Sequence, residues 1–182
     1  MPPTAVLPSC QLVIPVHDDS IWALVLTVGL VTRLACGTYD DIRMYDVDSG
    51  ALVFSPLTGH QDWVSSLLWS HDGIKLFSGA DDKTIRRWSS DTGEPIGHPW
   101  PGHTDDINSL SLSPDGSILA SASDGKTVRF WDTTTGSPIG QPLRHEECVH
   151  TVCFSPSGEF VDISKMGRKD IYCGGYLSWT VG

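Results

Sequence analysis

The sequence has few basic residues: 12 lysines and arginines stand against 22 aspartates and glutamates, which gives a formal net charge of −10 at pH 7. Proteins that bind nucleic acid by displacing counterions from phosphates carry clustered basic side chains. No basic stripe of that kind occurs in this sequence, which argues against a nucleic-acid partner. The acidic balance suits basic peptide partners, or it serves only to keep the protein soluble.

Paired cysteines and long apolar runs are also missing. Five cysteines lie scattered at positions 10, 36, 148, 153 and 173 without a C-x-x-C pair, a pattern typical of unpaired thiols in a reducing compartment. The apolar run 21–31 is about half the length that a membrane helix needs. No basic segment precedes an apolar one at the N-terminus. We therefore expect no membrane association and a cytoplasmic location, with the nucleus as the alternative.

Histidine and aromatic residues recur at a fixed spacing. The first three histidines of the pattern are 43 residues apart and the fourth follows after 42, and each aromatic residue stands 28 positions after its histidine. Two independent markers with one period indicate an internal repeat. The histidines are His17, His60, His103 and His145, and the aromatic residues are Tyr45, Trp88 and Trp131.

Between these markers, apolar and polar residues alternate with a period of two, which predicts strands and not helices. Turn sequences such as Pro114-Asp115-Gly116 separate the alternating segments. Four short antiparallel strands per copy form one propeller blade, so the sequence predicts an all-β fold. The predicted strands are 64–69, 75–79, 84–88 and 94–98 in the second copy, and 107–112, 118–122, 127–131 and 137–141 in the third.

Over residues 11–160 this pattern resembles the WD40-repeat family, and the Pro-Ile-Gly segment that follows each tryptophan strand resembles the repeat arrays of fungal NACHT-type WD40 proteins. The resemblance implies WD40-type propeller blades of four antiparallel strands around a channel. About three and a half blades are present, so we expect a partial or open propeller. The expected segments are an N-terminal segment 1–16 that contributes an outer strand, WD40 repeats over 17–160 (17–58, 59–101, 102–143 and a partial 144–160), and an irregular tail 161–182.

The resemblance also implies a hydrogen-bonded set within each blade, made of the histidine, a strand serine, a turn aspartate and the tryptophan. A buried imidazole and a buried indole N–H need such partners. The third copy has Gly125 in place of the aspartate, and Arg87 stands where the neighbouring copies are apolar, so it needs a polar partner at a blade interface. The matching residues are His60, Ser78, Asp82 and Trp88 in the second copy, and His103 and Trp131 in the third.

Acidic residues follow the repeat histidine in every copy. By the geometry that the resemblance implies, they lie in the loops that enter the innermost strands, on the narrower top face of the propeller. Carboxylates and an aromatic ring there would recognise Lys or Arg side chains of a peptide, and the alternative is an ordinary solvated loop. The predicted interaction residues are Asp18, Asp19, Asp62, Trp63, Asp105, Asp106, Glu146 and Glu147.

The sequence predicts neither catalysis nor a metal site or cofactor. Cys148, His150 and Cys153 lie on one predicted strand, but a period of two puts Cys153 on the opposite face from the other two. We therefore expect a protein–protein interaction scaffold that binds peptide segments on its acidic top face. The alternative is a structural fragment of a longer array, a truncated gene product that functions only with further blades or by self-association through open blade edges.

Overall fold

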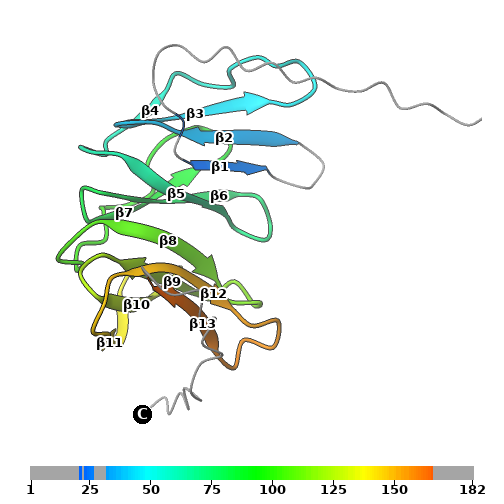
Figure 1. Ribbon diagram of the computed structural model, residues 1–182. Helices are drawn as coiled ribbons and strands as arrows, with labels where there is room; N and C mark the ends of the chain where they lie inside the picture. The colour runs from blue at the N-terminus through cyan, green and yellow to red at the C-terminus, as the bar shows by residue number, and fades with distance from the viewer. Residues whose placement is uncertain (1–20, 22, 27–31, 166–182) are drawn as a thin grey trace, which may run out of the picture.

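The computed structural model describes residues 21, 23–26 and 32–165. The regular elements in these residues are all β-strands, arranged in four antiparallel sheets that we call blades A to D. The sheets follow one another in chain order along the molecule and do not close into a barrel (Figure 1). The all-β fold and the partial propeller expected from the sequence are thus confirmed. Among the described residues, no helix has the length and apolar character that a membrane crossing requires.

Each blade runs from its innermost strand outward in chain order. Blade A has four strands and so has blade C, whereas blade B has three and blade D has two. Blade A consists of β1 (Ala23–Leu26), β2 (Arg33–Gly37), β3 (Asp41–Asp46) and β4 (Leu57–Thr58). Blade B consists of β5 (Val64–Trp69), β6 (Lys75–Ala80) and β7 (Ile85–Ser89). Blade C consists of β8 (Ile107–Leu112), β9 (Ile118–Ser123), β10 (Thr127–Asp132) and β11 (Pro138–Arg144), and blade D of β12 (Val149–Phe154) and β13 (Val161–Lys165).

The turns follow from local side-chain chemistry, as the β8–β9 turn shows. The Asp115 carboxylate accepts hydrogen bonds from Ser113 Oγ at 2.5 Å and from the Ser117 N–H at 3.1 Å. Gly116 has φ 75°, in the left-handed region that favours glycine. These contacts set the register that pairs Leu112 with Leu119 across the hairpin.

The core of the protein lies between successive blades. Strand β1 packs on β5, β5 on β8, and β8 on β12, so the innermost strands form a continuous series. Between blades A and B, Ile42 and Met44 pack with Leu76 and Trp88, all at most 1% exposed. Each blade therefore needs a neighbour to cover its apolar face.

The outer part of blade B departs from the prediction of a fourth strand at 94–98. Within this segment only Pro95 forms an isolated bridge, to Trp88, and a second isolated bridge joins Ile85 to Trp100 just beyond it. Pro95 has no N–H to donate to a ladder, and Gly97 turns the backbone with φ 74°. The prediction of a regular strand at 94–98 was therefore wrong.

The segment expected to be irregular from residue 161 begins instead with a regular strand. Strand β13 pairs antiparallel with β12, and Phe154 lies opposite Val161. Val161 is 5% exposed because it packs against blade C in the core cluster shared by the two blades. The rest of this tail and the expected outer strand in 1–16 lie outside the described residues.

Candidate functional site

His60 is the centre of a hydrogen-bonded set within blade B. Its Nδ1 lies 2.7 Å from Asp82 Oδ2, and its Nε2 lies 2.7 Å from Ser78 Oγ. Trp88 Nε1 donates to the same Ser78 hydroxyl at 2.8 Å. Because the carboxylate accepts the Nδ1 proton, Nε2 is left to accept the Ser78 O–H. The set joins the loop before β5 to β6, to β7 and to the turn between them.

Asp82 is the most heavily bonded member of this set. Besides His60, the Gln61 N–H donates to it at 3.1 Å, and Thr84 donates through its N–H at 3.0 Å and its hydroxyl at 2.7 Å. Burial acts to raise its pKa, but the hydrogen bonds from His60 and Thr84 and the electrostatic interaction with His60 outweigh burial and lower the pKa of Asp82 to about 2. Asp82 therefore holds the turn as an ionised carboxylate.

Blade C builds the same set without an aspartate. His103 Nε2 lies 2.6 Å from Ser121 Oγ, which accepts from Trp131 Nε1 at 2.8 Å. The other ring nitrogen lies 3.1 Å from Thr127 Oγ1. Burial and the charge of Arg129 lower the pKa of His103 to about 4, so this imidazole stays neutral at pH 7. Both hydrogen-bonded sets stabilise their blades, and their histidines are buried.

The predicted interaction residues lie immediately before the innermost strands. Asp62 and Trp63 precede β5 and are half-buried, and Asp106 precedes β8 and is half-buried beside the exposed Asp105. In blade D the matching residues are Glu146 and Glu147, which are exposed and lie before β12. Asp18 and Asp19 lie outside the described residues.

Four of the carboxylates at this end of blades B and C interact with one another. Burial, followed by the charges of Asp106, Asp62, Asp124 and Asp82, raises the pKa of Asp81 to about 6. Burial and then the charges of Asp105 and Asp124 raise the pKa of Asp106, against the opposing charge of Lys83. We call Asp62, Asp81, Asp106 and Asp124 the acidic cluster.

Two aromatic rings and one lysine border the acidic cluster. Tyr39, in the turn between β2 and β3, meets the Trp63 ring edge to face with centroids 5.0 Å apart, and it is 47% exposed. Lys83 Nζ donates to the Thr104 carbonyl at 3.2 Å and lies 3.8 Å from Asp105 Oδ1. The arrangement thus offers carboxylates, exposed aromatic surface and one weak internal cation. Among the described residues, no group of His, Cys, Asp or Glu has the arrangement that a metal ion needs.

Arg87 finds its polar partners across the blade B–C interface. Its Nη1 donates to the carbonyls of Thr133 at 2.6 Å and Thr134 at 2.8 Å, in the turn after β10. The guanidinium lies over the Trp100 ring, 5.6 Å from its centroid. The expected polar partner is therefore a pair of backbone carbonyls, and the side chain links two blades.

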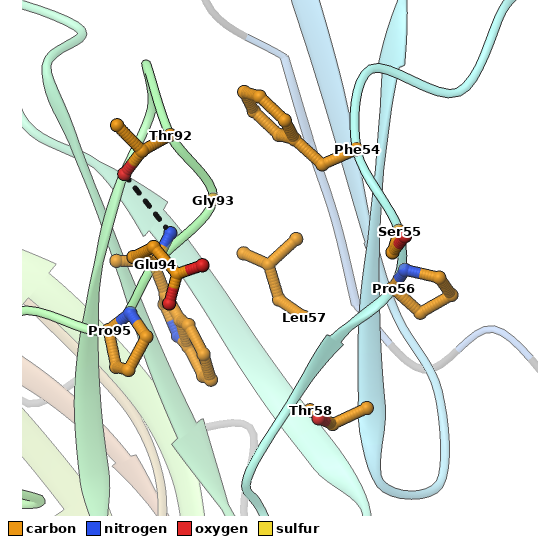
Figure 2. A pocket seen from close by; sticks show the side chains of 10 residues that line it. Phe54, Ser55, Pro56, Leu57, Thr58, Thr92, Gly93, Glu94 and Pro95 are labelled. Atoms are coloured by element: carbon orange, nitrogen blue, oxygen red, sulfur yellow. Dashed lines mark hydrogen bonds between the residues drawn. The ribbon is translucent and has the colours of Figure 1, made fainter.

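A hollow of about 350 Å³ lies where the outer parts of blades A and B meet. Phe54 and Leu57 face the segment Thr92–Pro95 across it (Figure 2). Glu94 is the one charged residue among those that line it, and its N–H donates to Thr92 Oγ1 at 3.3 Å. Since the hollow has one carboxylate and the acidic cluster has four, the acidic cluster is the better candidate for recognition of a cationic partner.

The sequence analysis did not identify Asp81, Asp124 or Tyr39 as candidate site residues. Asp81 and Asp124 are 43 residues apart, and each N–H bonds the carbonyl of the residue before an innermost strand, Trp63 at 2.9 Å and Asp106 at 3.0 Å. The 43-residue repeat interval could therefore have identified the two aspartates as equivalent residues of neighbouring blades. Tyr39 comes from a turn in another blade, and no sequence spacing marks its contact with Trp63.

Comparison with known proteins supports a WD40-repeat protein. The family described as "WD domain, G-beta repeat" matches residues 50–89 and 93–132, which span β4 of blade A, all of blade B, and β8 to β10 of blade C. The crystal structure of the computationally designed Ika4 protein superposes with a TM-score of 0.73 at 24% identity, covering 85% of this chain and 90% of that chain. This likeness shows the fold alone. A search of curated proteins found no match. WD40 repeats generally mediate protein–protein interaction and are typically non-catalytic scaffolds.

Proposed function

We propose that this protein is an interaction scaffold that binds basic peptide segments at the acidic cluster. The observation that carries the proposal is the gathering of four carboxylates in the acidic cluster, where burial, followed by the charges of Asp106, Asp62 and Asp124, raises the pKa of Asp81. Like charges that repel one another lower the stability of the folded protein. Carboxylates that are held together at this cost are typical of a binding site. A lysine or arginine side chain entering the cluster would relieve this repulsion through charge-assisted hydrogen bonds.

The neighbouring aromatic pair supports the same class of ligand. Tyr39 is exposed, and its contact with Trp63 fixes the tryptophan ring beside Asp62. A guanidinium or ammonium stacks favourably on such a ring. The loops of Asp105, Glu146 and Glu147 would then extend the peptide path toward blade D.

The test uses the full chain and a fluorescent peptide of alternating lysine and glycine, with a glutamate–glycine peptide as the negative probe. We expect the double variant Asp81→Asn/Asp106→Asn to bind the basic peptide at least about tenfold more weakly at low salt. Binding by the unchanged protein should weaken between pH 7 and pH 5, because the pKa of Asp81 is raised to about 6 and its carboxylate takes up a proton in that range.

The matched control is Asp91→Asn, which removes one exposed carboxylate from the turn after β7, outside the acidic cluster. This variant should keep the affinity of the unchanged protein. Equal affinities for the cluster variant, the control and the unchanged protein would refute the proposal.

A second candidate role is structural: the blades would function only with further blades or by self-association. The observation in its favour is the apolar surface of β1, where Leu24 is 60% exposed and Leu26 is 51% exposed. Sedimentation of the purified chain over a range of concentrations tests it, since a monomer that melts cooperatively would argue against this role.

The proposal extends to the cellular location and to the finer family resemblance. We place the protein in the cytoplasm, with the nucleus as the alternative, because the described cysteines Cys36, Cys148 and Cys153 are all free thiols. The resemblance of its Pro-Ile-Gly segments to fungal NACHT-type arrays stays a prediction. Fractionation of cells that express the chain tests the location.

A further inference from the structure

The back face of blade A, the face turned away from blade B, exposes apolar side chains, and none of the other described blades packs on it. Val25 points toward blade B, where it packs against the core shared with that blade. Because strand side chains alternate, Leu24 and Leu26 point to the opposite side. They are 60% and 51% exposed, and Ile21 on the same side is 38% exposed.

The other three blades cover the equivalent positions more fully, although Leu67 of blade B is only half-buried. The residues that match Leu24 are Leu67, Leu110 and Val152, and the last two are 8% and 4% exposed. The residues that match Ile21 are Val64, Ile107 and Val149, all with 0% exposure. In each case the covering surface is the preceding blade. The back face of blade A therefore has the character of a blade interface, and no blade of the described residues covers it.

The front face of blade D, as far as the described residues form it, does not match this surface. At the sheet position where blades A, B and C carry Ala35, Phe77 and Ala120, all buried against the next blade, blade D carries Asp162. Its neighbours on that face are Thr151, Ser164 and the exposed Cys153. Docking blade D of one copy on blade A of another would bury an unpaired carboxylate against leucine, which is strongly unfavourable.

We infer that the back face of blade A binds the same face of a second copy, forming a two-fold dimer through Ile21, Leu24 and Leu26. An isologous contact places apolar side chains on apolar side chains and buries none of the polar groups of blade D. This inference rests on the second role proposed above, completion of the open array by association. It leaves the acidic cluster, on blades B and C, free to bind peptide.

The test is sedimentation equilibrium of the full chain, with three variants. The unchanged protein should dimerise, and Leu24→Asp/Leu26→Asp should weaken the dimer at least about 100-fold, because four buried leucines are lost per dimer. Both side chains are exposed in the single chain, so the variant should fold, which circular dichroism checks. Ile74→Asp is the matched control: Ile74 is also 51% exposed, but it lies in the β5–β6 turn, and dimerisation should not change.

Asp162→Ala distinguishes the two possible arrangements. In the two-fold dimer this variant leaves the dissociation constant unchanged, whereas stronger association would indicate blade D docking on blade A and overturn the inference. A dimer that Leu24→Asp/Leu26→Asp does not weaken would also overturn it while leaving self-association standing. A chain that stays monomeric would refute both the surface and completion by self-association. Binding of the lysine–glycine peptide, measured on the same variants, reports separately on the acidic cluster.

Discussion

Replacing Asp82 with alanine should measure how far the hydrogen-bonded set stabilises blade B. The change removes the acceptor of four hydrogen bonds, from His60 Nδ1, Gln61 N–H and both donors of Thr84. The shift of the Asp82 pKa from 3.8 to about 2 corresponds to about 2 kcal/mol of interaction with the ionised form. Since the Asp82 side chain is only 10% exposed, solvent screens little of this energy. We expect Asp82→Ala to lower the free energy of unfolding by about 2 kcal/mol at pH 7.

The stability lost in Asp82→Ala should depend on pH in a defined direction. The folded-state pKa of Asp82 is lowered, so its contribution is complete above the unfolded value of 3.8 and is lost as the pH falls through about 2. The difference between the unchanged protein and Asp82→Ala should therefore be constant from pH 7 to pH 5. It should then shrink steadily toward pH 2.

The assay is urea unfolding followed by tryptophan fluorescence, at several pH values. Asp115→Ala is the matched control: hydrogen bonds from Ser113 and Ser117 also lower the pKa of Asp115 to about 2, but this carboxylate lies in an exposed turn. Solvent screening should make its loss of stability clearly smaller. Equal losses for the two variants, or an Asp82→Ala difference that does not change between pH 5 and pH 2, would refute the reasoning.

Two other variants test contacts between blades, both by thermal unfolding. Arg87→Ala should cost about 1–2 kcal/mol, because the carbonyl of Thr133 loses a charged donor; an unchanged midpoint would contradict this link. Gly136→Ala should cost at least about 2 kcal/mol, since an added Cβ would lie 2.1 Å from Trp100 Nε1. Gly140→Ala is its control, with φ 66° and no atom within 4 Å, and should cost only about 1 kcal/mol of backbone strain.

The repeat interval made most of the fold predictable from the sequence. The strand predicted at 107–112 is β8 to the residue, and the one predicted at 84–88 is displaced by one residue in β7. These strands are framed by local signals: turn residues at their ends and alternating side chains along them. The failures are the outer segment 94–98, where Gly97 redirects the chain, and β13, whose apolar residues pack against blade C. At β13 tertiary packing outweighs the local pattern, whereas at 94–98 the local features of Pro95 and Gly97 prevent a regular strand.

The candidate site was less predictable because it depends on which blades stand side by side. Asp62 and Asp106 follow from their places after the repeat histidines, but their interaction through Asp81 needs two blades at a fixed angle. The same holds for Arg87, whose carbonyl partners lie 46 and 47 residues away in sequence. A single sequence gives the position of such residues along a strand, and packing decides what they meet.

Asp81 and Asp82 are adjacent in one turn, yet their pKa values move in opposite directions. Asp82 faces His60, and its ionised form stabilises the folded state; Asp81 faces Asp62 and Asp106, and its ionised form destabilises the folded state. Lowering the pH through about 6 protonates Asp81 and adds stability, whereas lowering it below 3.8 protonates Asp82 and removes stability. These two groups together favour greatest stability between about pH 4 and pH 6, where Asp81 is largely protonated and the acidic cluster carries less negative charge than at pH 7. The turn therefore joins a carboxylate whose ionised form maintains the blade to one whose ionisation costs stability, a cost that the proposed binding of a cation would offset.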